Sequence, residues 1–136
     1  MVSIKTEFMI GELVKTKTGQ QIPQYLITCI EYRGVGQPIR YVTMNGVNEF
    51  TFRAMEIERI GRKPHYKHLE LLLASSFMPG DIIYHVTDKD SEPHLVTGIV
   101  YRGEGEGICI RVSTDKSDDY WLPYECSFEK HHSLTY

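Results

Sequence analysis

The stretch LITCIEYRGVG at residues 26–36 has a counterpart 69 positions later, LVTGIVYRGEG at residues 95–105. Identical residues alternate along the first part of each stretch, and residues two apart in a β-strand point to the same side of a sheet. We therefore expect the identical side chains to share one face, which lines the core of a small barrel. They are Leu26, Thr28, Ile30 and Tyr32, with Leu95, Thr97, Ile99 and Tyr101 as their counterparts.

The match continues without gaps over most of the chain. A period of 69 residues is too long for a solenoid unit and suits two copies of one small domain. We predict a first repeat over residues 1–62, a linker with a short helix over residues 63–76 and a second repeat over residues 77–136. Further identical pairs are Phe8 and Phe77, Met9 and Met78, Gly11 and Gly80, Thr18 and Thr87, Ile39 and Ile108, and Glu56 and Glu125.

Each repeat contains short runs rich in β-branched and aromatic residues, separated by Gly, Asn, Asp, Ser and Pro. Such runs predict strands. Residues 34–37, residues 103–106 and Asn45-Gly46 predict hairpin loops, because Gly adopts positive φ without a steric penalty. The predicted strands are Gly11–Lys17, Gln24–Arg33, Pro38–Met44, Glu49–Phe52 and Glu56–Ile60, then Gly80–Thr87, Pro93–Arg102, Gly107–Ser113, Asp119–Leu122 and Glu125–Glu129.

The linker begins with Gly61-Arg62-Lys63-Pro64, which breaks regular structure. Residues 66–75 follow it and contain four leucines, so they predict a short helix. We expect this helix to pack against one or both barrels. Its apolar side could equally form a contact between two chains.

The composition is that of a folded protein, with 41% hydrophobic and 11% aromatic residues among 136. The sequence has no apolar run near the roughly 18 residues of a membrane span, and its N-terminus lacks the apolar core of a signal peptide. Cys29, Cys109 and Cys126 are an odd, widely spaced set that does not form a disulfide framework. We expect a cytoplasmic protein with reduced thiols.

Each repeat opens with Gly-acidic-apolar-apolar and closes with an aromatic strand, a turn and Glu, and in this it resembles an SH3-like small barrel of the Tudor or KOW kind. The resemblance covers nearly the whole chain and implies a mainly β fold of two tandem SH3-like five-stranded barrels joined by a short helical linker. Barrels of this class serve many unrelated functions, so the fold does not decide the function. The residues that carry the resemblance are Gly11–Val14, Phe50–Phe52 and Met55–Ile57, then Gly80–Ile83, Tyr120–Leu122 and Tyr124–Cys126.

The sequence gives no signature of catalysis or of a cofactor. The glycine-rich residues 102–107 are followed by a strand-like run instead of the helix that a phosphate loop needs, and Glu104 and Glu106 would repel a phosphate. No Gly-x-Ser-x-Gly motif is present, and Cys109 lies in an apolar run that favours an inert thiol. We expect a protein that is not an enzyme and has no cofactor.

Metal-site motifs are equally incomplete. Asp88–Glu92 alternates acidic residues as a calcium loop does, but Pro93 stands where the sharp turn needs Gly. His65 and His68 could share a helix face and His131-His132 are adjacent, yet no cysteine pair has zinc-finger spacing. We expect these side chains to be solvated and no metal to be bound.

Aromatic residues beside arginines are the best candidates for a binding site. One tyrosine ends the second strand of each repeat next to an arginine, and further aromatic residues lie in the fourth strands. Tudor-like barrels hold methylated cations in aromatic cages, so the resemblance implies such a cage, with core or inter-barrel packing as the alternative. The candidate residues are Tyr32, Arg33, Phe50, Tyr101, Arg102, Tyr120 and Trp121.

The net charge of −3 conceals a split between the two parts of the chain. Residues 1–68 carry ten basic and six acidic side chains, a net charge of +4, whereas residues 69–136 carry five and twelve, a net charge of −7. Such polarity can steer a partner or attract the opposite part of a second copy. Solvated surface of no special function is the alternative.

We expect a non-enzymatic binding or assembly module that acts on a protein partner or on a second copy of itself, without contact to a membrane. The alternative is a nucleic-acid-associated accessory protein that binds through the basic first repeat, where Arg33, Arg40 and Arg53 lie near aromatic residues. The acidic second repeat limits that footprint. A third possibility is a small ligand in the groove between the barrels.

Overall fold

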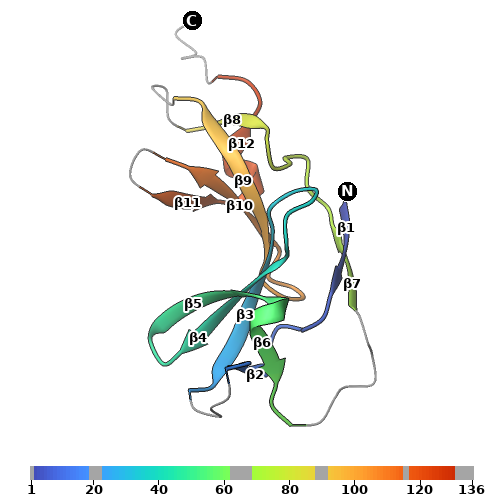
Figure 1. The fold of residues 1–136 in the computed structure, drawn as a ribbon. Helices are drawn as coiled ribbons and strands as arrows, with labels where there is room; N and C mark the ends of the chain where they lie inside the picture. Colours follow the sequence, from blue (N-terminus) through green and yellow to red (C-terminus); the bar gives the residue numbers. More distant parts are fainter. Residues whose placement is uncertain (1, 19–22, 62–68, 88–91, 115–116, 131–136) are drawn as a thin grey trace, which may run out of the picture.

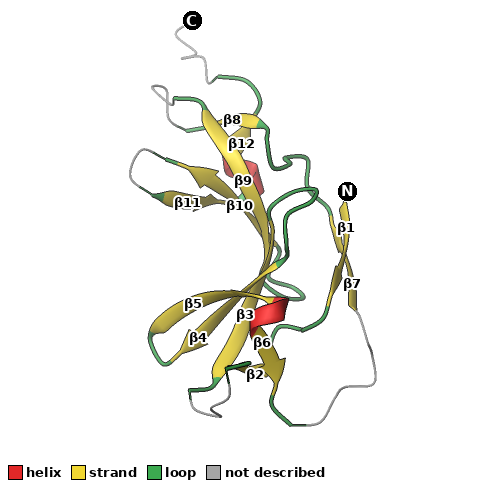
Figure 2. Cartoon of the chain, viewed as in Figure 1, coloured by secondary structure: helices red, strands yellow, loops and turns green. Residues whose placement is uncertain are grey.

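The computed structural model describes residues 2–18, 23–61, 69–87, 92–114 and 117–130. We call residues 2–61 the first half and residues 69–130 the second half. Over the described residues the chain is mainly β, as predicted (Figures 1 and 2). The first half contains β1 (Val2–Thr6), β2 (Leu13–Thr16), β3 (Tyr25–Tyr32), β4 (Arg40–Asn45), β5 (Asn48–Arg53), the short 3-10 turn η1 (Ala54–Glu56) and β6 (Ile57–Arg59). The second half contains β7 (Leu69–Leu73), β8 (Ile82–His85), β9 (His94–Tyr101), β10 (Ile108–Ser113), β11 (Asp118–Trp121), the 3-10 turn η2 (Pro123–Glu125) and β12 (Cys126–Ser127).

The 69-residue period extends to the secondary structure. The bounds of β2 and β8, of β3 and β9, and of η1 and η2 differ by that offset. Hydrogen bonds recur at the same offset: the Gly11 N–H donates to the Ile27 carbonyl over 2.8 Å, and the Gly80 N–H donates to the Val96 carbonyl over 2.9 Å. The two halves therefore share their backbone arrangement as well as part of their sequence.

In each half, four consecutive strands form an antiparallel meander, and the last strand returns to pair with the first of the four; we call these five strands the meander of that half. The spatial order is β5-β4-β3-β2-β6 in the first half and β11-β10-β9-β8-β12 in the second. The outer strands of each meander find no further partner among the described residues, so neither half closes into the barrel that the sequence predicts. Hairpin loops lie at residues 34–37, at residues 103–106 and at Asn45-Gly46, as predicted.

Two strand pairs join the halves, and we call them together the joint. β3 pairs with β9, with Glu31 opposite Val100, which makes one ten-stranded sheet of both meanders. β1 pairs with β7 in a separate two-stranded sheet, with Ser3 opposite Leu72. In Figure 1 the hairpins β4–β5 and β10–β11 extend to one side of the β3–β9 pair, and β1–β7 lies on the other side.

The predicted helix over residues 66–75 is wrong where the structure describes it, because Leu69–Leu73 form the strand β7. Leu73 is buried and Leu71 packs against the core, whereas Leu72 between them is 65% exposed, which is the alternation of a strand. A short run of leucines is compatible with a helix or a strand, and here the pairing with β1 stabilises the strand. Residues 66–68 lie outside the described residues. In the described part of the chain, no helix is long and apolar enough to cross a membrane.

β3 and β9 each contain a β-bulge at the same repeat position. Their registers against β4 and β10 shift at Thr28 and at Thr97, which have no cross-strand partner. Each threonine hydroxyl donates to a carbonyl of the neighbouring strand over 3.2 Å, Thr28 to Val42 and Thr97 to Arg111. This shared hydrogen bond explains why both halves have threonine at the bulge.

The bulge also corrects the predicted core face of β3. Ile30 and Tyr32 are buried as expected, and so is Ile27 on the other side of the bulge. Leu26 is 40% exposed and its counterpart Leu95 is 42% exposed. The prediction that these two leucines line the core is wrong, because an extra residue reverses the alternation of inward and outward side chains.

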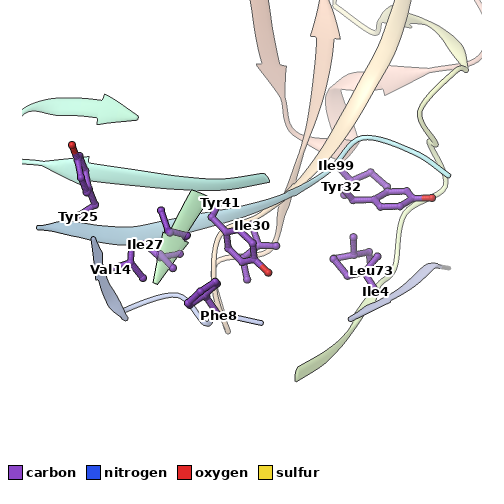
Figure 3. Close-up of a cluster of buried hydrophobic side chains, with 11 residues drawn as sticks. Ile4, Phe8, Val14, Tyr25, Ile27, Ile30, Tyr32, Tyr41, Leu73 and Ile99 are labelled. Carbon is purple, nitrogen blue, oxygen red and sulfur yellow. The ribbon is translucent and has the colours of Figure 1, made fainter. Parts of the chain in front are cut away.

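The larger of two hydrophobic cores lies behind the joint. Ile4 of β1 and Leu73 of β7 pack with Tyr32 of β3 and Ile99 of β9, as Figure 3 shows. Because the two halves both contribute to this cluster, burial of its apolar surface holds them together. The smaller core lies within the second half and consists of Ile83, Val96, Ile110, Val112, Trp121 and Cys126.

Candidate binding groove between the two halves

The structure distributes the predicted aromatic residues over several places. Tyr32 is buried in the larger core, and Tyr101 packs against the same core. Trp121 is buried in the smaller core, whereas Phe50 and Tyr120 are about half exposed on different halves. These residues therefore do not gather around one site, and four of the seven candidates act first in packing: Tyr32, Tyr101, Phe50 and Trp121.

Phe50 belongs to a three-ring cluster with Tyr25 and Phe52. The ring centroids lie 5.2 Å apart for Tyr25 and Phe50, 5.0 Å for Tyr25 and Phe52, and 6.4 Å for Phe50 and Phe52. Rings at these distances pack against each other and leave no room for a cation between them. In the second half His94 and Trp121 take the places of Tyr25 and Phe52, with centroids 5.0 Å apart.

A buried carboxylate at the joint binds two arginines. The Glu31 side chain is 2% exposed and accepts a hydrogen bond from Arg33 Nε over 2.5 Å. Its Oε1 atom also lies 3.6 Å from Arg111 Nε on β10 of the second half. Arg111 in turn pairs with Asp118 and donates to the Thr97 hydroxyl. The charge of Glu31 is thus compensated from both halves, as a buried carboxylate requires.

Two neighbours shape this ion-pair network. A Cβ on Gly98 would lie 3.1 Å from the Tyr32 carbonyl oxygen, which is a tight contact with backbone, and 3.5 Å from Glu31 Cγ, which is an ordinary contact, so glycine eases the approach of β9 to β3 at this point. Tyr120 borders the network from β11, where burial, reinforced by the Glu31 carboxylate, raises the pKa of its hydroxyl. The phenol therefore stays neutral beside the carboxylate near neutral pH.

A groove of about 490 Å³ runs beside the network, between the two halves. The first half contributes the loop after β3, in which Val35 is 96% exposed, and the second half contributes Leu95 and the bulge residue Thr97. Arg33 connects the groove to Glu31, because its Nε atom is bound to that carboxylate. The full lining, which we call the cross-half groove, is Arg33, Gly34, Val35, Gln37, Pro79, Gly80, Leu95, Val96 and Thr97.

Arg102, the counterpart of Arg33, has a different environment. Its Nη2 atom donates to the Glu106 carbonyl within its own loop over 2.5 Å. The carboxylate position of Glu31 is taken by Val100 in the second half. The two predicted arginines therefore differ: Arg33 borders the cross-half groove, and Arg102 stabilises the hairpin loop after β9.

A second groove of about 440 Å³ lies within the first half, between β1 and η1. Met55 at its rim is 65% exposed, and the Tyr41 hydroxyl on its floor accepts a hydrogen bond from the Glu7 N–H. None of the predicted site residues lines it. Its lining is Lys5, Glu7, Pro38, Ile39, Tyr41, Arg53, Ala54 and Met55.

The three cysteines are free thiols. Burial raises the pKa of Cys29, and burial together with the Glu125 carboxylate raises the pKa of Cys126 to about 11. Thiols with raised pKa values are poor nucleophiles and poor metal ligands at neutral pH. Among the described residues, no three His, Cys, Asp or Glu side chains are placed to hold a metal ion. His65, His68, Asp88–Ser91 and His131-His132 lie outside the described residues.

Sequence reasoning finds one side of the cross-half groove and misses the other. The glycines of residues 34–36 predict the loop, and Arg33 is among the predicted site residues. Pro79, Leu95 and Thr97 give no such signal, because the bulge that turns Leu95 outward leaves no mark in a pattern of period two.

No family model, curated protein or solved structure matches the chain.

Proposed function

We propose that the protein is a non-enzymatic binding or assembly module that holds an extended segment of a protein partner in the cross-half groove. The observation that carries the proposal is that both halves line this groove and that an ion-pair network fixes them beside it. A groove whose walls are already fixed loses little conformational entropy when a partner binds. The groove is open to solvent, which suits an extended segment lying across it better than an enclosed small ligand.

The lining favours a peptide with apolar side chains. Val35 of the first half and Leu95 of the second half expose apolar surface at the groove, and Pro79 adds to it. Gly34 and Gly80 permit close approach of a peptide backbone, and Thr97 and Gln37 offer polar groups to it. We further propose that each half is an open form of the SH3-like unit that the sequence resembles, on the strength of the meander order shared by both halves.

Peptides selected from a random library on the immobilised chain test the proposal. Their affinity should fall at least about tenfold in Leu95→Asp, which places a charge on the apolar wall. Val47→Asp is the matched control, because Val47 is 91% exposed in the β4–β5 turn and does not line the groove. Peptides that bind Leu95→Asp as tightly as the unchanged protein would place the binding site elsewhere.

The nucleic-acid alternative has weaker support from the geometry. Four basic side chains of the first half are bound to carboxylates, which reduces the charge that they offer to phosphates. Titration of a single-stranded oligonucleotide at about 50 mM salt tests this alternative directly, and tight, salt-dependent binding would favour it over the peptide proposal. The ion pairs are Lys15–Glu58, Arg33–Glu31, Arg53–Glu56 and Arg59–Glu12.

A further inference from the structure

The joint relates the two halves by an approximate two-fold axis. Glu31 lies opposite Val100, which is the residue 69 positions after Glu31 itself, and Ser3 lies opposite Leu72, which is its own counterpart in the same way. Each joining strand thus pairs antiparallel with its own repeat equivalent. This is the geometry by which two copies of one surface associate in symmetric dimers.

Loop contacts across the joint obey the same relation. A Cβ on Gly34 would lie 3.5 Å from Pro79, and a Cβ on Gly103, the counterpart of Gly34, would lie 3.8 Å from Ile10, the counterpart of Pro79. The loop of each half therefore approaches the equivalent residue of the other half, as a two-fold axis requires. The joint therefore requires one first half and one second half, and these two halves can belong to the same chain or to two different chains.

The ion-pair network makes the joint selective for unlike halves. Arg111 compensates Glu31 from the second half, and the first half has Val42 at the equivalent position. Two first halves would therefore bring two buried Glu31 carboxylates together, each with its own Arg33 but without an Arg111, which is unfavourable. At Gly98 a Cβ would lie 3.1 Å from the Tyr32 carbonyl oxygen across the joint, and the equivalent residue of the first half is Cys29.

We propose that a second copy of this chain can occupy the joint by exchange of halves, the first half of each chain pairing with the second half of the other. The resulting dimer keeps every contact of the joint and contains two cross-half grooves. Each groove then takes its loop from one chain and Leu95 and Thr97 from the other. Two observations favour a second copy of this chain as the partner: the two-fold register of β3 and β9, and the pairing of Glu31 with Arg111.

Shortening the connection between the halves tests the exchange. Deletion of residues 63–67 should hinder pairing within one chain and leave pairing between two chains intact, as short hinges do in exchanged dimers. We expect light scattering to give twice the mass of the shortened chain, whose mass is slightly below the 15.7 kDa of the full chain. Differently tagged dimers should not mix under native conditions and should mix after joint unfolding and refolding. A monomeric deletion variant, or dimers that mix freely without unfolding, would overturn the proposal.

Charge reversal provides a second, independent test. Glu31→Arg and Arg111→Glu each create a mismatched joint within one chain, but an exchanged dimer of the two variants contains one reversed pair and one original pair. Refolding the two variants together should give a heterodimer that neither forms alone. A mixture that behaves as the sum of its components would contradict the exchange. If the two charge-reversal variants do not fold, the deletion of residues 63–67 remains the test of the proposal.

Discussion

At the position of Glu31 the two halves differ in charge: the first half has a buried carboxylate, and the second half has an apolar side chain. Glu31 occupies a buried strand position whose counterpart is Val100, and it is compensated by Arg33 on its own side and by Arg111 across the joint. In sequence it lies between Ile30 and Tyr32, on the face opposite the predicted core face. The fold buries it because the second half covers that face, which no pattern within the first half can reveal.

Cys126 gives the stability of the protein a pH dependence. Burial, together with the Glu125 carboxylate, raises the pKa of its thiol from 9.0 to about 11. The folded state therefore keeps the thiol proton at pH values where the unfolded chain loses it. The resulting stabilisation is complete below pH 9 and is lost as the pH rises towards about 11.

Urea unfolding over this range measures the effect. The unfolding free energy should fall from pH 9 to about pH 11 more steeply in the unchanged protein than in Cys126→Ala. Comparison with this variant removes the contributions of Cys29 and Tyr120, whose pKa values are also raised. Equal slopes in the two proteins would show that Cys126 is not the titrating group.

At the scale of elements, the turns η1 and η2 explain why both repeats have glutamate at the same position, Glu56 in the first and Glu125 in the second. Glu56 accepts a hydrogen bond from the Arg53 N–H, and Glu125 accepts one from the Leu122 N–H, both over 2.8 Å. The Arg53 N–H holds the pKa of Glu56 below its ordinary value of 4.5. Each carboxylate thereby fixes the start of the turn that leads into the last strand.

Removal of either carboxylate should destabilise the protein. Glu56→Ala and Glu125→Ala are each expected to lower the unfolding free energy by about 0.5–2 kcal/mol, the range for loss of a capping side chain. Glu129→Ala is the control, because Glu129 is exposed beyond the last strand. Urea denaturation measures all three. A cost as small as that of the control for either variant would show that its hydrogen bond does not stabilise the turn.

The strands were largely predictable and their faces were not. β-branched runs and glycine loops locate β3 and β9 to within one residue, and the 69-residue match predicts that they are equivalent. The outward direction of Leu26 and Leu95 depends on the bulges, and the strand at Leu69–Leu73 depends on its pairing with β1. Both are decided by a partner distant in sequence, which local propensity does not contain.

The same limit applies to the candidate site. Arg33 could be singled out from sequence because it follows an aromatic strand end and precedes a glycine loop. The opposite wall of the cross-half groove, with Pro79 and Leu95, comes from the other half and depends on the pairing of β3 with β9. A site formed at a joint between repeats is visible only once the joint is known.

At the scale of the whole molecule, the joint connects the two repeats through a shared sheet and a shared core. A unit as short as one half buries a smaller fraction of its surface on folding than a longer domain does, and it is marginal alone. Here β3 and β9 continue a single sheet, and the larger core includes Ile99 of the second half among the residues of the first. We therefore expect the two halves to fold and unfold together.

The most direct test of this claim is the unfolding of Ile57→Ala, followed by two signals. Ile57 is buried in β6 of the first half, and Trp121, the one tryptophan of the chain, reports on the second half. The substitution should lower the unfolding free energy by about 2–5 kcal/mol. If the joint couples the halves, Trp121 fluorescence and far-ultraviolet circular dichroism will shift together by that amount. A Trp121 transition left in place, with a two-step circular dichroism curve, would contradict the account.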